Sequence, residues 1–312
     1  MLEPHLGARV AGAFALGGHA TLTGPVAAGR LGRVWRLETD RGTWAVKDTP
    51  HPVSAAEVAR DAAYQDTVRA HGVPMPAVVR APDGSALVDV EGPVRAYSWV
   101  DVQPREQRLD PVAVGRLLAA VHAVRVPTRE PVDGWYVDAV DHAVWDVLVT
   151  RLESAGAPFA GRLATLLPAM GEAARVLAPP DDVQLCHRDL WADNLLRRHD
   201  GGLVVLDWEN SGPAGPAHEL AMVTYEFGCG EPARMRAVRD AYADAGGTAR
   251  ITGPADLTML VAQTHHILQT GCERWLASVD EEGRADNEAW VSEFLDDPVD
   301  GGTVELLLSA LA

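Results

Sequence analysis

Lysine is almost missing from this chain. Of its 27 basic residues, all but one are arginine, and the exception is Lys47 in the strand-like segment TWAVK, residues 43–47. A compact ammonium group with three rotatable donors suits nucleotide phosphates differently from a flat guanidinium group. Chance alone can leave one surface lysine, but the place of Lys47 on a predicted strand, upstream of two acidic motifs, favours a functional role.

Cysteine is scarce, and long apolar runs are absent. Cys186, Cys229 and Cys272 are odd in number and widely spaced, which excludes a disulfide framework or a zinc pattern and predicts buried free thiols. No stretch has the apolar length of a membrane span. Residues 10–18 are apolar, but no cleavage region of the signal-peptide kind follows them. We therefore expect a cytoplasmic protein without a membrane partner.

Positive charge is also in short supply, since the formal net charge is −17. No basic stripe is available to meet a phosphate backbone, so nucleic acid is excluded as a partner. The acidity is compatible with a cationic ligand. A generally acidic proteome, rich in arginine and alanine, explains it equally well, so charge alone does not identify an amine substrate.

The first hundred residues are predicted to form a β-rich lobe with one main helix. At 312 residues the chain is long enough for two lobes. The helix is expected over 54–71, where Ser54 is a plausible N-cap and Glu57 has the capping-box spacing. Proline ends it at 72–76. The expected strands cover 21–24, 33–39, 43–48, 78–79, 86–90 and 94–99.

The remainder is predicted to be mainly helical. Asp110 and Pro111 open the first helix as N-cap and first-turn residue. The fold class is therefore α+β, with an N-terminal lobe of residues 1–100 and a C-terminal lobe of residues 101–312. The further helices are expected over 140–155, 158–177, 219–227, 232–245, 257–276 and 303–312.

Two acidic motifs carry the chemistry. Residues 187–194 read HRDLWADN, and the apolar run 203–206 ends in the DWE of residues 207–209. In kinases, the order His-x-Asp, four residues, Asn places a carboxylate on the acceptor hydroxyl and an amide oxygen on magnesium. A carboxylate at the mouth of a buried strand can hold the same metal. A turn or N-cap role explains each acid singly, but not the whole set.

Lys47 and these two motifs resemble the aminoglycoside phosphotransferase family, and the resemblance covers most of the chain. It implies a bilobal protein-kinase-like fold that uses ATP or GTP with Mg²⁺. Asp189 would be the catalytic base or the group that orients the acceptor. Asn194 and Asp207 would bind the magnesium ion. The family usually carries an aspartate where this chain has Glu219, which we interpret as a structural cap or loop tether.

The same resemblance places a nucleotide site in the N-terminal lobe. The glycine-containing loop 24–32, including Gly29, would cover the phosphates, since glycine permits close backbone approach. Arg30 and Arg33 either contact phosphate or lie in solvent. The backbone of Ser98 and Val100 would bind the base.

Glu57 is the expected partner of Lys47. An ion pair from helix to strand would orient the ammonium toward the phosphates. The capping-box position of Glu57 offers a purely structural role instead. Asp61 lies one turn further along the same face.

An acceptor site is predicted from aromatic and acidic residues near the motifs and on later helices. Aromatic faces with nearby carboxylates suit an amino sugar, whose ring stacks and whose ammonium pairs. Each residue also has an ordinary role in the core or on the surface, and Trp208 is expected in the core. The candidates are Trp191, Glu209, Asn210, Glu226, His266, Gln269 and Trp275.

These patterns predict a kinase that phosphorylates a hydroxyl of a small polar acceptor. An aminoglycoside, another sugar-containing antibiotic or an amino sugar is the preferred class. The alternatives are a metabolic kinase of the hexosamine, choline or homoserine type, and a non-catalytic nucleotide-binding protein on the same fold. A protein kinase is disfavoured, because little chain remains between Asp207 and the next helix for a peptide-docking segment.

Overall fold

The chain divides into two compact units, each of which joins segments distant in sequence. The computed structural model describes residues 2–29, 32–49, 53–126 and 128–312. Unit 1 joins residues 1–106 with 189–211, and unit 2 joins 107–188 with 212–312. The lobe boundary at residue 100 stays a prediction. By compactness alone, residues 189–211, which contain most of both acidic motifs, group with the first hundred residues.

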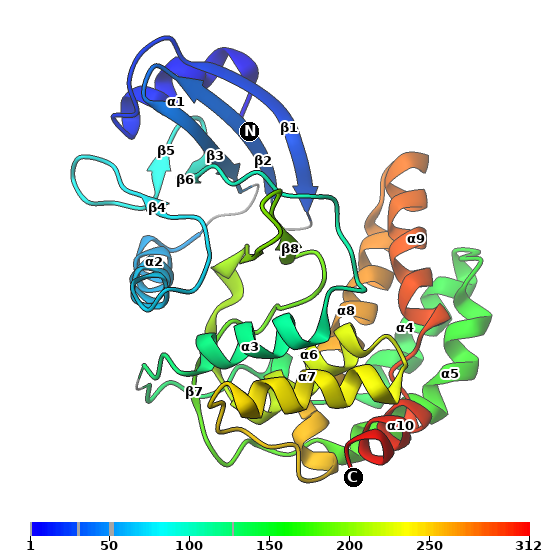
Figure 1. Cartoon of the computed structure of the whole chain (residues 1–312). Coiled ribbons are helices and arrows are strands. Elements are labelled where there is room, and N and C mark those ends of the chain that lie inside the picture. The colour runs from blue at the N-terminus through cyan, green and yellow to red at the C-terminus, as the bar shows by residue number, and fades with distance from the viewer. Residues whose placement is uncertain (1, 30–31, 50–52, 127) are drawn as a thin grey trace. The chain divides into compact units, whose positions relative to one another are not determined.

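Unit 1 is built on an antiparallel sheet (Figure 1). Its strand order is β1-β2-β3-β6-β4, and β5 also pairs with β6. Lys47 lies opposite Val34 on one side and opposite Arg95 on the other, so two basic side chains are neighbours across the sheet. The strands are β1 (Thr21–Gly29), β2 (Gly32–Thr39), β3 (Gly42–Asp48), β4 (Val78–Val79), β5 (Val88–Asp89) and β6 (Pro93–Ser98).

Two helical segments accompany this sheet. The expected helix is α2 (Ala55–Ala70), and the Ser54 side chain caps it by accepting from the Glu57 N–H at 3.4 Å. A second segment, η1 (Pro4–Leu6) followed by α1 (Gly7–Ala13), was not predicted. Its residues Leu6 and Val10 are buried in one cluster with strand residues such as Leu37. The short apolar stretch at the N-terminus therefore completes the core of the sheet.

A short hairpin in unit 1 positions the acidic motifs. It consists of β8 (Leu195–Arg197) and β9 (Leu203–Val205), followed by η4 (Trp208–Asn210). Leu195 pairs with Val205, and the Leu206 N–H donates to the Asn194 carbonyl at 2.8 Å. The register thus brings the residue before β8 and the residues after β9 to the same end of the hairpin.

Unit 2 is mainly helical, as predicted. Asp110 caps α3 by accepting from the Val112 N–H at 3.2 Å. One helix, α9, was missed because its sequence is highly charged and buries few residues. The elements are α3 (Pro111–His122), η2 (Gly134–Tyr136), α4 (His142–Ser154), α5 (Ala160–Ala173), η3 (Ala174–Val176), β7 (Gln184–Cys186), β10 (Gly212–Ala214), α6 (Pro216–Gly228), α7 (Pro232–Asp244), η5 (Pro254–Leu257), α8 (Thr258–Ala277), α9 (Glu281–Asp296) and α10 (Gly301–Leu311).

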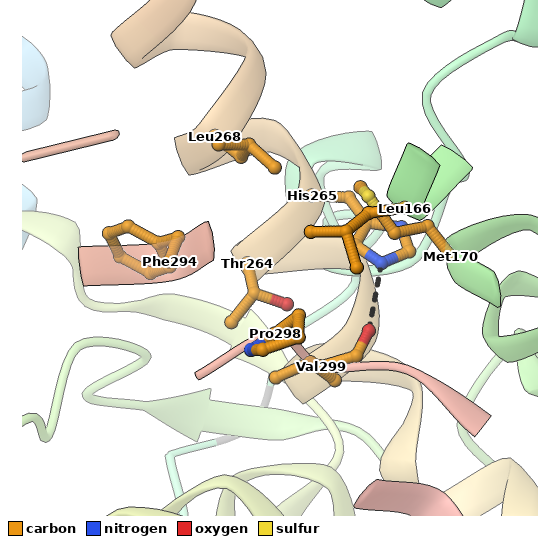
Figure 2. A pocket seen from close by; sticks show the side chains of 8 residues that line it. All are labelled: Leu166, Met170, Thr264, His265, Leu268, Phe294, Pro298 and Val299. Atoms are coloured by element: carbon orange, nitrogen blue, oxygen red, sulfur yellow. Dashed lines mark hydrogen bonds between the residues drawn. The ribbon is translucent and has the colours of Figure 1, made fainter. Parts of the chain in front are cut away.

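One small cavity lies in unit 2. Its volume is about 10 Å³, and Figure 2 shows the side chains that line it, which are mostly apolar and include His265. Burial lowers the pKa of His265 to about 4, and its Nε2 lies 3.2 Å from the Val299 carbonyl oxygen. A space of this size holds about one water molecule, so it is a packing defect. Among the helices in the described ranges, none is both long and apolar enough to cross a membrane.

Candidate active site

Asp189 is held by two side-chain amides in unit 1. The Nδ2 atoms of Asn194 and Asn210 each donate to its Oδ2 at 3.0 Å, and Asn194 Nδ2 also lies 2.8 Å from the Asp189 carbonyl oxygen. Burial and the charge of Asp207 raise the pKa of Asp189 to about 6, although both amides act in the opposite direction. A fixed carboxylate with a pKa near neutrality is suited to accept a proton.

Asn194 and Asp207 lie at the same end of the β8–β9 hairpin, as its register requires. Asp207 adopts the left-handed conformation, with φ 52° and ψ 68°, a region where aspartate is found more often than most residues. The Asn194 amide nitrogen is used by Asp189, so its amide oxygen is the atom that can meet a metal ion. One carboxylate and one amide oxygen are ligands that fit Mg²⁺.

Lys47 is buried among carboxylates of unit 1. Its Nζ lies 2.9 Å and 3.1 Å from the two oxygens of Asp207 and 3.0 Å from Glu209 Oε2. Burial disfavours the charged amine, but Asp207 and Glu209 outweigh it and raise the pKa of Lys47. The one lysine of the chain is therefore a charged group beside a candidate metal ligand.

The expected ion pair between Lys47 and Glu57 is wrong. Glu57 is exposed on α2, and no ion pair joins it to Lys47 among the described residues. The contact from α2 comes one turn later and is indirect, because Asp61 lies 3.6 Å from Arg95 Nη1. The prediction failed because the partner of Lys47 comes from η4, far along the chain.

The expected phosphate loop is largely strand. Residues 24–29 belong to β1, Gly32 begins β2, and Gly29 pairs with Gly32, while Arg30 lies outside the described residues. A Cβ at Gly32 would collide with the Asp48 carbonyl oxygen, so glycine is needed there. Arg33 binds Asp48 at 2.7 Å, which gives it a structural partner.

The predicted base-binding backbone lies at the end of β6. The Ser98 N–H already donates to the Ala77 carbonyl at 2.9 Å, and its Oγ accepts from the Ala77 N–H at 2.8 Å. Of the Ser98 backbone groups, the carbonyl oxygen is therefore the one left for a nucleotide base. Contact of Ser98 and Val100 with a nucleotide stays a prediction.

Three of the acceptor candidates belong to unit 1, and two of them have other partners. Glu209 pairs with Lys47, and Asn210 donates to Asp189, so both belong to the cluster around the predicted catalytic groups. Trp191 is half-buried, and its role stays a prediction. Trp208 lies in the core, as expected, with 3% exposure.

The other acceptor candidates belong to unit 2. Trp275 packs edge-on against Phe159 with 5.6 Å between ring centroids and is buried, and its place in an acceptor site stays a prediction. Its indole completes the helical core.

The remaining acceptor candidates each contact another side chain of unit 2. The His266 ring stacks on Trp135 with 5.1 Å between ring centroids, and Gln269 donates to Glu273 at 2.9 Å. Glu226 is buried and accepts from the Gln107 side-chain amide at 3.4 Å.

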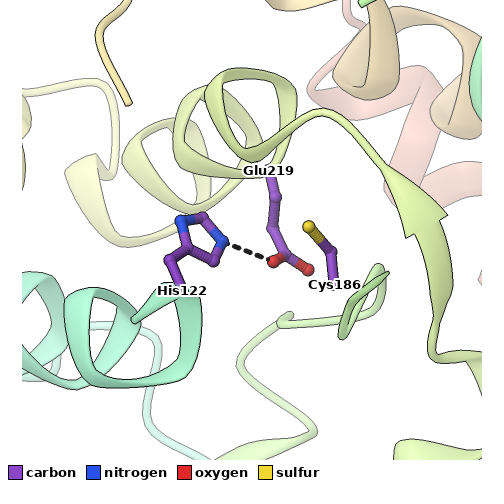
Figure 3. Close-up of side chains that lie close together, drawn as sticks. All are labelled: His122, Cys186 and Glu219. Atoms are coloured by element: carbon purple, nitrogen blue, oxygen red, sulfur yellow. Dashed lines mark hydrogen bonds and ion pairs between the residues drawn. The ribbon is translucent and has the colours of Figure 1, made fainter. Parts of the chain in front are cut away.

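Glu219 tethers the backbone that leads into Asp189. Figure 3 shows it on α6, facing His122 and Cys186. One oxygen accepts from the Arg188 N–H, and the other lies 2.7 Å from His122 Nε2. Burial opposes its charge, but these donors lower the pKa of Glu219 overall. This is the tether that the sequence suggested.

His122, Cys186 and Glu219 bring three potential metal-ligand atoms within 4.8 Å of one another. Burial raises the pKa of the Cys186 thiol, which disfavours a thiolate ligand. Tyr242 lies 2.9 Å from the other nitrogen of His122, so hydrogen bonds within the protein account for the imidazole. Sequence reasoning missed His122 and Tyr242 because only the fold brings them to Glu219.

Comparison with known proteins identifies a protein family that matches this chain. Residues 23–256 match the family described as the phosphotransferase enzyme family. No curated protein matches the chain. Similar solved structures do exist, at low sequence identity, and they confirm the predicted protein-kinase-like α+β fold.

Three of these structures illustrate the range of proteins that share the fold. A spectinomycin phosphotransferase bound to ADP and spectinomycin is 14% identical, with a TM-score of 0.62 over 93% of this chain and 92% of its own. An aminoglycoside phosphotransferase from Alicyclobacillus acidocaldarius is 16% identical, with a TM-score of 0.62 over 99% and 96%. A microcompartment-associated aminopropanol kinase is 17% identical, with a TM-score of 0.57 over 94% of each chain.

Proposed function

We propose that this chain, which belongs to the phosphotransferase enzyme family, is a small-molecule kinase. It moves the γ-phosphoryl group of ATP or GTP to a hydroxyl of a small polar acceptor. The observation that carries the proposal is the clustering of Asp189, Asn194, Asp207 and Lys47 in unit 1. In that cluster Lys47 pairs with Asp207, and Asn194 donates to Asp189. Phosphoryl transfer mainly requires that the reacting groups are positioned and the phosphate charge is neutralised, and these four side chains can do both.

Asp189 is the group that acts on the acceptor. Its carboxylate orients the hydroxyl and takes its proton while the new O–P bond forms and the bond from the γ-phosphorus to the bridging oxygen breaks. The nucleoside diphosphate then leaves. The two amides on Oδ2 fix the carboxylate in one orientation, and this pre-organisation lowers the cost of alignment in the transition state.

Lys47 and the metal ligands act on the nucleotide. The Lys47 ammonium neutralises phosphate charge from β3. Asn194 and Asp207 would hold Mg²⁺, which supplies further neutralisation at the phosphates. A buried ammonium beside two carboxylates keeps its charge, which is the state that this role needs.

An aminoglycoside, another sugar-containing antibiotic or an amino sugar is the proposed acceptor class. The chain is strongly acidic, which is compatible with a cationic acceptor. His266 stacked on Trp135 offers an aromatic surface of the kind that binds sugar rings. Amino-alcohol and hexosamine acceptors use the same catalytic groups, so the test includes them.

A phosphorylation screen tests the proposal. The purified protein with Mg²⁺ and ATP or GTP is incubated with a panel of aminoglycosides, nucleoside antibiotics, amino sugars and amino alcohols, and products are identified by mass spectrometry. One acceptor gaining one phosphoryl group is the expected result and fixes the class. Tight nucleotide binding with no phosphorylated product from any acceptor would favour the non-catalytic alternative.

A further inference from the structure

Glu209 is the carboxylate placed closest to Lys47 apart from the candidate metal ligand. Its Oε2 lies 3.0 Å from Lys47 Nζ, and the two side chains are 10% and 9% exposed. Both charges are therefore largely withdrawn from water. An ion pair of this kind fixes the position of both groups, because leaving either charge alone in such a site is costly.

A second cation holds Glu209 from the neighbouring strand. Arg95 lies opposite Lys47 in the β3–β6 register, and its Nη1 is 3.7 Å from Glu209 Oε1 and 3.6 Å from Asp61 Oδ2. Glu209 thus lies between two basic side chains of the sheet. Helix α2 reaches this cluster through Asp61 and Arg95.

The two carboxylates that contact Lys47, those of Asp207 and Glu209, differ in their proposed roles. Asp207 is a proposed magnesium ligand, and a carboxylate bound to a divalent cation attracts a neighbouring ammonium less strongly. Glu209 can keep its contact with Lys47 while Asp207 serves the metal. Glu57, which is exposed on α2, makes no such contact among the described residues.

From these contacts we infer that Glu209 is the positioning residue that holds Lys47 toward the nucleotide phosphates, in place of a glutamate on α2. The inference rests on the proposed function, since it concerns the same site. It assigns Glu209 to nucleotide binding and removes it from the acceptor site. It also makes Asp61 and Arg95 the link between α2 and the lysine.

Matched carboxylate-to-amide variants test this assignment. Glu209→Gln and Glu57→Gln each remove one charge with little change of shape. Asp66→Asn is the control for loss of a charge, because Asp66 lies on α2 and forms an exposed ion pair with Arg80. Binding of ADP with Mg²⁺ is measured by calorimetry, and KM for ATP, KM for the acceptor and kcat are measured where an acceptor is known.

Glu209→Gln is expected to weaken ADP binding and to raise KM for ATP by about tenfold or more, as for removal of one partner of a buried charge pair. KM for the acceptor stays unchanged, which distinguishes a role at Lys47 from general damage. Glu57→Gln stays within about twofold of the parent, like Asp66→Asn, because exposed charges contribute little. Nucleotide binding that falls in Glu57→Gln and not in Glu209→Gln overturns the inference.

The single lysine gives a second readout that needs no activity. Amine acylation followed by peptide mass spectrometry reports on Lys47, since it is the one lysine side chain of the sequence and its peptide is resolved from the one that carries the N-terminal amine. Labelling should speed up in Glu209→Gln, where the ammonium loses a shielding partner, and stay at the parent rate in Glu57→Gln. Equal labelling in all variants contradicts the inference even if the chain phosphorylates nothing, whereas failure of the parent to bind ADP contradicts the proposed function instead.

Discussion

Each unit of this protein contains a network of carboxylates, and the two networks are held by different kinds of donor. In unit 1, Asp207 and Glu209 meet the charged side chains of Lys47 and Arg95. In unit 2, Glu219 is satisfied by hydrogen bonds from the Arg188 backbone and His122. A carboxylate held by side-chain cations can share those cations with a bound ligand, whereas one held by a backbone N–H fixes a loop. Changes in the first should alter kinetics, and changes in the second should alter stability.

Asp189→Asn should have the largest effect. The amide cannot accept the acceptor proton, so kcat is expected to fall about 10³-fold. ADP binding should remain, because Asp189 acts on the acceptor. Steady-state kinetics and calorimetry on the same preparation check both points. Near-parental turnover would remove Asp189 from the catalytic role.

Glu219→Ala should reduce stability rather than nucleotide affinity. It leaves the Arg188 N–H and His122 without their acceptor in a fully buried site. We expect a loss of about 3 kcal/mol in the free energy of unfolding. Urea unfolding monitored by fluorescence measures it. If stability is unchanged while ADP affinity falls, the distinction between the two networks is incorrect.

Lys47→Ala should lower kcat/KM for ATP about 100-fold, as for loss of one buried electrostatic donor. The variant also leaves Asp207 and Glu209 close together without their cation, so nucleotide binding and folding are measured together. Initial rates over a range of ATP concentrations give the kinetic constant. An unchanged value for a folded variant would exclude Lys47 from the site.

Asp61 should produce the smallest effect, a dependence of stability on pH. Burial and the charge of Glu209 raise the pKa of Asp61 from 3.8 to about 6, although the charge of Arg95 acts in the opposite direction. The folded state therefore binds more protons than the unfolded state between these values, so stability falls as the pH rises from about 4 to about 6. Asp61→Asn should remove this slope and gain on the order of 1 kcal/mol at neutral pH, after allowance for solvent screening.

That slope is measured by urea unfolding at several pH values, with Asp66→Asn as the control, since Asp66 is an exposed acid on the same helix. Parallel pH profiles for the parent and Asp61→Asn would show that Asp61 titrates normally in the folded state.

Local signals in the sequence predicted much of the fold and part of the site. The capping residues Ser54 and Asp110 mark helix starts that the structure contains. The family resemblance drawn from Lys47 and the two acidic motifs is confirmed by the match over residues 23–256. Asn194 and Asp207 come together because a short hairpin separates them, and hairpin register is a local property.

Long-range pairing explains what the sequence could not predict. Glu57 has the spacing of a lysine partner, but Glu209 takes that position because η4 follows the hairpin into the sheet cluster. Trp275 has the residue type of a sugar contact, yet it faces Phe159 in the helical core. Helix α9 lacks a strong apolar stripe, so only its packing against α8 identifies it.

Titration of the intact protein with ADP, with and without Mg²⁺, tests the central claim most directly. The claim is that the cluster of Lys47, Asn194 and Asp207 in unit 1 binds a magnesium nucleotide. Calorimetry should show saturable binding of one nucleotide per chain that strengthens markedly when Mg²⁺ is present. No saturable binding, or binding that is indifferent to Mg²⁺, would contradict the claim.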